Sequence, residues 1–346
     1  MQDVSQENLR CINYNHSIDL LKFIGSIMIF TMHISAFRDF EQLSFVFELL
    51  TRWAVPFYFV CSAYFLFSKG KNGNITKTDL KKYIKRIAML YLCWFIINLP
   101  SVIACDFYSH NIFNWKVWFC FFRDLVLSSS FSGSWYLVSC MFSAVFVYLL
   151  SKRMRTVTVL VIAFCIQTFC IFTSVYAGVL PPILDDVLFE MNFPLNIFGG
   201  VVYFAMGKFI FEKEYLFKNL SLFSCVMLTV LFYELYVGEI FLAKTFGIYG
   251  GSDEAFCLIP VSLFLFLGCQ KACFQINHSR DLRKMSTVIY CCQGNVLVFV
   301  PKFLEICGVN ASLARLLLGG LCVAVIVAVV FALQKSKKLK WAKYLT

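Results

Sequence analysis

The sequence predicts an all-α polytopic membrane protein with about ten transmembrane helices and both termini in the cytoplasm. Three observations predict this class. Of the 346 residues, 60% are hydrophobic and 15% are charged, and the mean hydropathy is +0.75, a composition typical of membrane proteins. Apolar runs long enough to cross a bilayer recur along the chain. Basic residues gather in alternate connecting segments, which places those segments on the cytoplasmic side.

Ten apolar segments define the predicted helices, taking about 17–25 residues as the usual length of a span. They cover residues 17–37, 45–68, 84–104, 135–150, 156–176, 194–211, 219–236, 255–270, 286–303 and 312–334. The segment 115–127 carries tryptophans and charges that suit an interfacial helix better than a span. These segments divide the chain into a cytoplasmic N-terminal segment (1–16), a membrane-embedded domain (17–334) and a basic cytoplasmic tail (335–346).

The charges supply an independent test of this count, because a missed helix would disturb their alternation. Basic residues cluster around 69–86, 152–155, 208–218, 271–284 and 335–343, all on one predicted side. The opposite side receives the acidic loops with Asp185, Asp186, Glu190, Asp253 and Glu254. The formal net charge of +11 therefore indicates membrane orientation, and no nucleic-acid partner is expected.

The first predicted helix carries the leading functional candidates, Asp19, Lys22 and His33. Each of them costs free energy in hydrocarbon unless it is paired or functional. At about 100° per residue, Lys22 and His33 share one helix face and lie about 16 Å apart along the axis. Lys22 then lies near the cytoplasmic boundary and His33 in the outer half. Imidazole is the side chain best suited to proton transfer near neutral pH, so His33 is a candidate catalytic base.

These residues also fit ordinary structural roles. Asp19 sits in the first helical turn, where the helix dipole favours a carboxylate. Lys22 also fits a side chain that extends to the lipid headgroups. Arg52 with Trp53 fits an interfacial anchor, and the basic stretch Lys69–Arg86 fits a segment that sets orientation.

Four stretches carry a resemblance to a known family. Ile18–His33 resembles the first helix of the acyltransferase-3 family of bacterial integral-membrane O-acyltransferases, in which ten residues separate a basic residue from a histidine. Arg52–Phe65 resembles the second-helix segment of that family, and Lys82–Arg86 its basic cluster entering the third helix. Trp135-Tyr136-Leu137 is similar to its tryptophan-aromatic-leucine element.

The resemblance implies a membrane-bound O-acyltransferase of the bacterial cytoplasmic (inner) membrane. It would move an acyl group, with acetyl favoured, from cytoplasmic acyl-CoA to a hydroxyl of a cell-surface glycan or a lipid-linked precursor. Acyl-CoA is then a co-substrate, and neither a permanently bound cofactor nor a metal is expected. His33 is implied as the catalytic base, and Asp19 as its supporting acid through pairing with Lys22.

The same resemblance implies two binding regions. Lys22, Lys82, Lys85 and Arg86 would hold the phosphates of the coenzyme. Arg52, Trp135 and Tyr136 would shape an outer pocket for the acceptor or stabilise the oxyanion.

The sequence departs from the family pattern at two positions. Lys22 stands where arginine is frequent, which loses bidentate phosphate contacts but keeps the charge. Gln293 ends a segment, Ile289–Gln293, that often ends in histidine. A glutamine cannot transfer protons, so His33 alone would supply the base.

Three alternatives remain open. The chain also fits a secondary transporter or polysaccharide exporter in which Lys22, His33 and Glu234 form an intramembrane polar site. It also fits an inactive scaffold of the same fold. Within the enzyme hypothesis, acylation of His33 itself competes with general-base catalysis.

Overall fold

The protein is described by a computed structural model that covers residues 16–107, 113–181, 184, 187, 196–272, 275–336 and 339–346. These residues are mostly helical and contain no β-strand. Residues 1–15, which form most of the predicted N-terminal segment, lie outside the described residues, as do Asp185, Asp186 and Glu190.

In chain order, the α-helices of the described residues are α2 (His16–His33), α3 (Glu41–Thr51), α4 (Ala54–Phe67), α5 (Lys77–Val102), α6 (Trp115–Leu127), α7 (Trp135–Ser151), α8 (Thr156–Phe172), α10 (Val201–Glu212), α11 (Leu222–Thr245), α12 (Leu258–Lys271), α13 (Ser279–Ile306) and α14 (Ser312–Lys335). Short turns of other helix types are η1 (Ile103–Phe107), η2 (Ala177–Val179), η3 (Glu214–Phe217) and η4 (Lys340–Leu345).

The all-helical prediction is confirmed for the described residues, and each of the ten apolar segments contains a helix. Five helical stretches are long and apolar enough to cross a membrane: 41–67, 77–105, 222–245, 279–306 and 312–335. The apolar helices α7, α8 and α12 are shorter. The count of ten spans and the cytoplasmic position of both termini stay predictions.

The second segment corresponds to the helical stretch 41–67, in which Arg52 and Trp53 form a turn between the end of α3 at Thr51 and the start of α4 at Ala54. One predicted boundary is wrong. The basic stretch after residue 76 is not a loop, because α5 already begins at Lys77. Its start is fixed by a capping box: Thr76 Oγ1 accepts from the Asp79 amide, and Asp79 Oδ2 accepts from the Thr76 amide, both at 3.1 Å.

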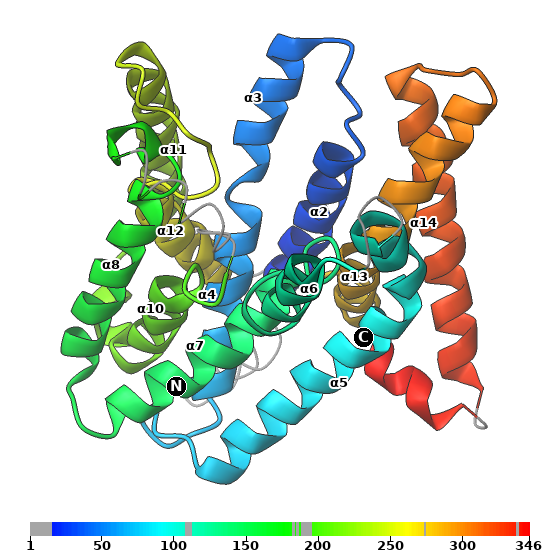
Figure 1. The fold of residues 1–346 in the computed structure, drawn as a ribbon. Coiled ribbons are helices and arrows are strands. Elements are labelled where there is room, and N and C mark those ends of the chain that lie inside the picture. The colour runs from blue at the N-terminus through cyan, green and yellow to red at the C-terminus, as the bar shows by residue number, and fades with distance from the viewer. Residues whose placement is uncertain are drawn as a thin grey trace.

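The bundle has α4 in its interior, with α8, α10, α11 and α12 on one side and α13 and α14 on the other (Figure 1). Helix α2 packs along α13, and α10 packs along α4. Small residues allow these close crossings. A Cβ at Gly207 of α10 would lie 2.5 Å from the Val60 carbonyl oxygen of α4, so only glycine fits there without a shift.

Polar side chains lock the long helices together. Asn98 of α5 donates to the Cys291 carbonyl of α13 at 2.9 Å and accepts from the Asn295 amide at 3.1 Å. At the start of α14, Asp39 Oδ2 accepts from the Ser312 amide and hydroxyl at 3.0 and 2.6 Å. These hydrogen bonds hold the Asp39 pKa below its usual range. They stabilise the free amides of that helix end.

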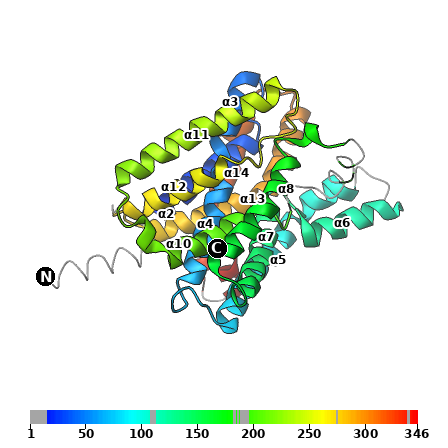
Figure 2. The ribbon, with the colours of Figure 1, turned by 90° about the vertical axis from the view of Figure 1, so that its left-hand side faces the viewer.

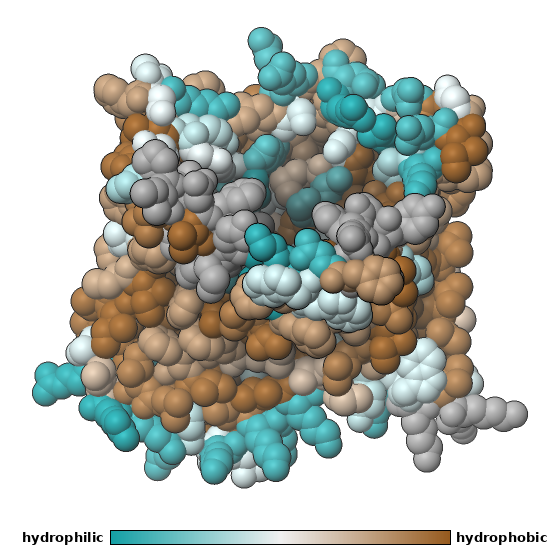
Figure 3. Space-filling model, in the orientation of Figure 1, coloured by the Kyte–Doolittle hydropathy of each residue, from teal (hydrophilic) through white to brown (hydrophobic). Residues whose placement is uncertain are grey.

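The surface has the pattern of a protein in a bilayer. Large apolar side chains are exposed on α11 and α14, among them Phe223 and Leu317, and exposed apolar area of this extent indicates contact with lipid. Figure 3 shows a hydrophobic band above an edge of hydrophilic residues, and a hollow with hydrophilic residues in the upper half. Helix α6 has no buried residue and lies at the periphery of the bundle (Figure 2), as its interfacial prediction requires.

Candidate functional site

The larger of the two cavities that contain the predicted site residues has a volume of about 500 Å³, and we call it the inner cavity. Helices α2, α4, α5, α7 and α13 form its walls, and Lys69, which follows α4, contributes at its edge. Its polar and charged lining consists of Asp19, Lys22, Tyr58, Ser62, Ser68, Lys69, Tyr83, Arg86, Tyr136, Arg283, Ser286, Thr287, Tyr290 and Thr346. A cavity of this size can hold a large polar ligand.

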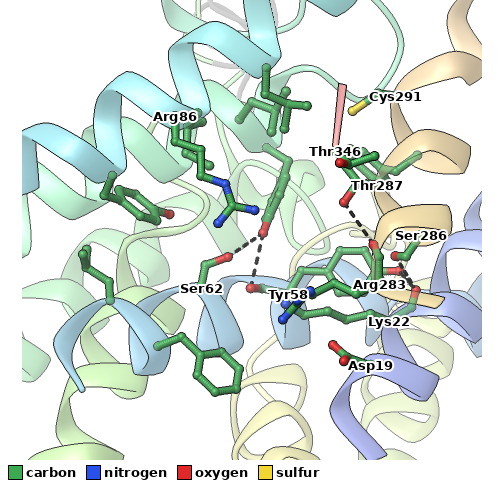
Figure 4. Close-up of a pocket in the computed structure, with 18 of the residues that line it drawn as sticks. Asp19, Lys22, Tyr58, Ser62, Arg86, Arg283, Ser286, Thr287, Cys291 and Thr346 are labelled. Carbon is green, nitrogen blue, oxygen red and sulfur yellow. Dashed lines mark hydrogen bonds between the residues drawn. The ribbon is translucent and has the colours of Figure 1, made fainter. Parts of the chain in front are cut away.

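Positive charge dominates the inner cavity. Lys22 of α2, Arg86 of α5 and Arg283 of α13 approach it from three helices, and Figure 4 shows their side chains directed toward the same space. One carboxylate, Asp19, is buried beside them and interacts with the charges of Arg283 and Lys22. With Lys69 added, the described residues place four cationic side chains and one carboxylate side chain around the inner cavity, which favours an anionic ligand.

The backbone at Lys22 is fixed from two sides. Its carbonyl oxygen accepts a hydrogen bond from Tyr58 Oη of α4 at 2.6 Å and another from Ser286 Oγ of α13 at 2.8 Å. A helix carbonyl that accepts extra bonds from two neighbouring helices cannot slide along either of them. Helices α2, α4 and α13 are therefore joined to one another at the level of Lys22.

A second cavity of about 260 Å³ contains His33, and we call it the outer cavity. Its polar and aromatic lining consists of His33, Thr51, Arg52, Phe59, Ser129, Ser132, Trp135, Tyr203, Asp253, Glu254 and Tyr290. His33 is the last residue of α2 and its surface is exposed. The imidazole is thus open to a ligand in the outer cavity.

Arg52 organises the polar wall beside His33. Its guanidinium pairs with Glu48 at 2.5 Å and with Asp253, and its Nε donates to Ser252 Oγ at 3.0 Å. The turn between α3 and α4 directs Arg52 toward the 246–257 loop. The arrangement fixes the acidic loop against α3, and only 17% of the Arg52 side chain is exposed.

Glu254 is a buried carboxyl group at the edge of the outer cavity. It accepts a hydrogen bond from Gln167 Nε2 at 2.5 Å, and its own amide donates to Ser174 Oγ at 3.1 Å. Burial, with the charge of Asp253 added, raises the pKa of Glu254 well above its ordinary value. Burial therefore favours the neutral form of Glu254.

Three tyrosines form the wall between the two cavities. Tyr290 lines both of them. Its ring centroid lies 5.6 Å from that of Tyr136 and 6.2 Å from that of Tyr58, in edge-to-face arrangements. Its hydroxyl donates to the Gly133 carbonyl at 2.8 Å. The two cavities therefore meet at a single aromatic layer.

The structure separates the predicted site residues into two groups. Asp19, Lys22, Arg86 and Tyr136 line the inner cavity, whereas His33, Arg52 and Trp135 line the outer one. The inner placement of Tyr136 differs from the outer position predicted for it. It follows from packing, because the hydroxyl of Tyr136 lies 2.9 Å from Ser62 Oγ of α4.

Asp19 lies beside Lys22 in the inner cavity, whereas two further predicted residues lie away from it. Lys82 and Lys85 are exposed on α5 and line neither the inner nor the outer cavity. Arg86, which is also exposed, is the basic residue of this cluster that lines the inner cavity.

Sequence reasoning did not select Arg283, which adds positive charge to the inner cavity, or Tyr290, which lines both cavities. Arg283, Ser286, Thr287 and Tyr290 recur at the helical spacing i, i+3, i+4 and i+7, and all four line the inner cavity. That spacing marks one face of α13. It was a detectable signal, although nothing in the sequence shows which neighbour the face meets.

Fold and site together define a helical membrane protein in which a cation-lined inner cavity meets an outer cavity that contains His33 and Arg52. The acyltransferase-3 family, described as an acyltransferase domain, matches residues 15–333. The chain belongs to this family, which confirms the resemblance and indicates a membrane acyltransferase.

Two curated relatives are both named amino-acid racemase and come from Enterococcus faecalis. One is 23% identical over 225 residues, which cover 61% of this chain and 30% of the relative. The other is 21% identical over 355 residues, which cover 95% of this chain and 47% of the relative. The chain thus spans less than half the length of the curated relatives it matches, and the activity in their name stays theirs. No solved structure matches the chain.

Proposed function

We propose that the protein transfers an acyl group, with acetyl favoured, from cytoplasmic acyl-CoA to a hydroxyl of a cell-surface glycan or its lipid-linked precursor. The observation that supports this most is the pair of cavities: one is rich in cations, the other contains His33, and Tyr290 borders both. A donor with phosphates needs a cation-rich cavity, and an acceptor hydroxyl needs a base, so the two cavities match the two substrates. The proposal places the chain in the bacterial cytoplasmic membrane, with the inner cavity facing the cytoplasm.

The inner cavity suits the donor. Arg86 and Arg283 present planar guanidinium groups that bind phosphate oxygens in pairs, and Lys22 adds a point charge. Lys82 and Lys85 lie on the exposed side of α5, where they raise the local concentration of an anionic donor without contacting it. Asp19 keeps its place beside Arg283 and Lys22 as a positioning carboxylate for these cations.

The chemical step needs one base. The pantetheine arm carries the thioester past Tyr290 toward His33. His33 takes the proton of the acceptor hydroxyl as its oxygen attacks the thioester carbon. A new C–O bond forms, the C–S bond breaks, and the coenzyme thiolate leaves and receives the proton from His33. The products are an ester and free coenzyme A.

The outer cavity suits a hydroxyl-rich acceptor. The Trp135 ring offers an apolar face for a sugar ring, and Asp253 presents a carboxylate to hydroxyl groups. Arg52 holds Asp253 in place.

The test compares acylation in cells that carry the wild-type chain, His33→Ala or Lys22→Ala at equal membrane abundance. The readout is alkali-labile acyl label in the glycan fraction of the envelope. His33→Ala is expected to lower labelling about 100-fold or more, the usual effect of losing a general base. Lys22→Ala is expected to raise the donor concentration required.

Matched controls are His278→Ala and Lys81→Ala, which alter an exposed histidine and an exposed lysine and should leave labelling unchanged. Full labelling with His33→Ala would refute the proposed chemistry. Movement of a glycan across the membrane without consumption of acyl-CoA would favour the transporter alternative.

A further inference from the structure

Gln293 is a buried amide without a hydrogen-bond partner. It lies in the middle of α13 and is 0% exposed, and neither its Nε2 nor its Oε1 is hydrogen-bonded within the part of the chain that the structure describes. Nearly all buried polar groups in proteins are hydrogen-bonded, and an exception calls for an explanation. Among the described residues, Gln167 is also 0% exposed, and although its Oε1 has no partner, its Nε2 donates to Glu254.

The amide lies directly behind the wall between the two cavities. Gln293 follows Tyr290 by three residues on α13, so the two share a helix face. A Cβ at Gly133 would lie 2.9 Å from Gln293 Nε2 and 3.2 Å from Tyr290 Cζ. Gly133 itself lines the outer cavity and has a positive φ of 78°. The glycine therefore leaves only backbone between the amide and the outer cavity.

The polar residues near Gln293 form hydrogen bonds between helices, whereas the Gln293 side chain forms none within the described residues. Asn98 and Asn295 form the hydrogen bonds that join α5 to α13. Asn295 also accepts from the Ser101 amide at 3.1 Å. The amide of Gln293 contributes nothing to this lock, so its presence at this depth is not explained by helix packing.

We propose that Gln293 binds the carbonyl oxygen of the acyl group during transfer. This inference rests on the proposed function. An acyl group that crosses from the inner to the outer cavity must displace Tyr290 and break its hydrogen bond to Gly133. That displacement opens the space in front of the amide. Nε2 then donates to the carbonyl oxygen as the acceptor oxygen attacks the carbon and negative charge builds on that oxygen.

Gln293 stabilises charge and His33 moves the proton, so their roles differ. The C–O bond forms, the electron pair of the carbonyl moves to the oxygen that faces Gln293, and it returns as the C–S bond breaks. No additional reactant is needed. Glutamine suits this role because its amide donates a hydrogen bond and carries no charge to be neutralised in the resting protein.

Gln293→Met tests the assignment, because methionine fills a similar volume without a donor. The assay measures transfer of label from acetyl-CoA to the envelope glycan fraction in membrane vesicles, together with the thermal unfolding midpoint of the purified chain. Transfer at saturating acetyl-CoA is expected to fall about 100-fold, as for the loss of one oxyanion donor. The unfolding midpoint should stay equal or rise, because a buried amide without partners is removed.

Gln167→Met is the matched control. It breaks the bond to Glu254 and should lower the unfolding midpoint, as expected for a glutamine with a structural role. Gln293→Leu repeats the test if the methionine variant accumulates poorly.

The outcomes separate this inference from the proposed function. If the wild-type chain transfers label and Gln293→Met does so at the same rate, the role of Gln293 is refuted and the proposed function stands. A parallel loss of rate and unfolding midpoint would assign Gln293 a structural role and also refute the inference. If the wild-type chain transfers no acyl group, the proposed function fails, and the role of Gln293 fails with it.

Discussion

Replacing Arg52 with methionine should destabilise the protein and disturb the outer cavity together. The guanidinium pairs with Glu48 and Asp253 and donates to Ser252. Methionine keeps much of the packed volume but leaves both carboxylates facing each other without a cation. Removing one partner of a buried ion pair costs about 3–5 kcal/mol. Because 33% of the Glu48 and 29% of the Asp253 side chain are exposed, we expect the lower end, about 3 kcal/mol.

The assay is thermal unfolding of the purified chain in detergent. At about 2 °C per kcal/mol for a large domain, the midpoint should fall by about 6 °C. Arg52→Lys keeps the charge but not the fork, so its midpoint should lie between those of wild type and Arg52→Met. The double variant Arg52→Met/Asp253→Asn should recover part of the loss, because it removes one of the unpaired charges.

An Arg52→Met midpoint within about 1 °C of wild type would show that these ion pairs do not stabilise the protein. A double variant as unstable as the sum of Arg52→Met and Asp253→Asn would show that the two residues are not coupled. Acyl transfer supplies a second readout, since the Arg52 side chain lines the same cavity as His33.

The remaining predictions concern packing and pH. Gly207→Ala should lower the free energy of unfolding by about 1–3 kcal/mol, because its Cβ would lie 2.5 Å from the Val60 carbonyl oxygen. A Cβ at Gly320 meets nothing within 4 Å, so Gly320→Ala should leave the unfolding midpoint nearly unchanged. Equal effects of the two substitutions would contradict the close packing at Gly207. Burial raises the Glu254 pKa, so its contribution to stability is complete below about pH 4.3 and is lost as the pH rises through the raised value. Wild type should thus lose stability relative to Glu254→Gln between about pH 5 and about pH 8, as measured by unfolding midpoints at both pH values, and parallel profiles would count against a buried neutral acid.

The positions of the helices and the side chains that share a helix face could be predicted from the sequence. Lipid demands apolar runs with satisfied backbones, and these runs located the helices. The helical period placed Lys22 and His33 on one face of α2 at different depths, and the structure puts them in two different cavities. The stretch 115–127 was predicted as a helix from its own composition and forms α6.

Adjacent residues show where prediction from the sequence stopped. Trp135 and Tyr136 belong to one motif, yet Trp135 lines the outer cavity and Tyr136 the inner one. Successive residues on a helix point about 100° apart. The motif therefore does not show which helix face contacts which neighbour. For the same reason Arg86 of α5 lines the inner cavity, whereas Lys82 and Lys85 line neither cavity.

The apolar runs and the motif from Lys22 to His33 were enough to predict a helical membrane protein of the acyltransferase-3 family with a polar first helix. Helix packing, in contrast, places Arg283 with Lys22 in one cavity, Arg52 with the acidic loop, and Tyr290 between the two cavities. These arrangements depend on residues far apart in the sequence: Arg52 and Asp253 are 201 positions apart, and Tyr290 and Gly133 are 157 apart. Helix periodicity is a local property, whereas such contacts depend on how whole helices pack, so no short stretch of sequence contains them.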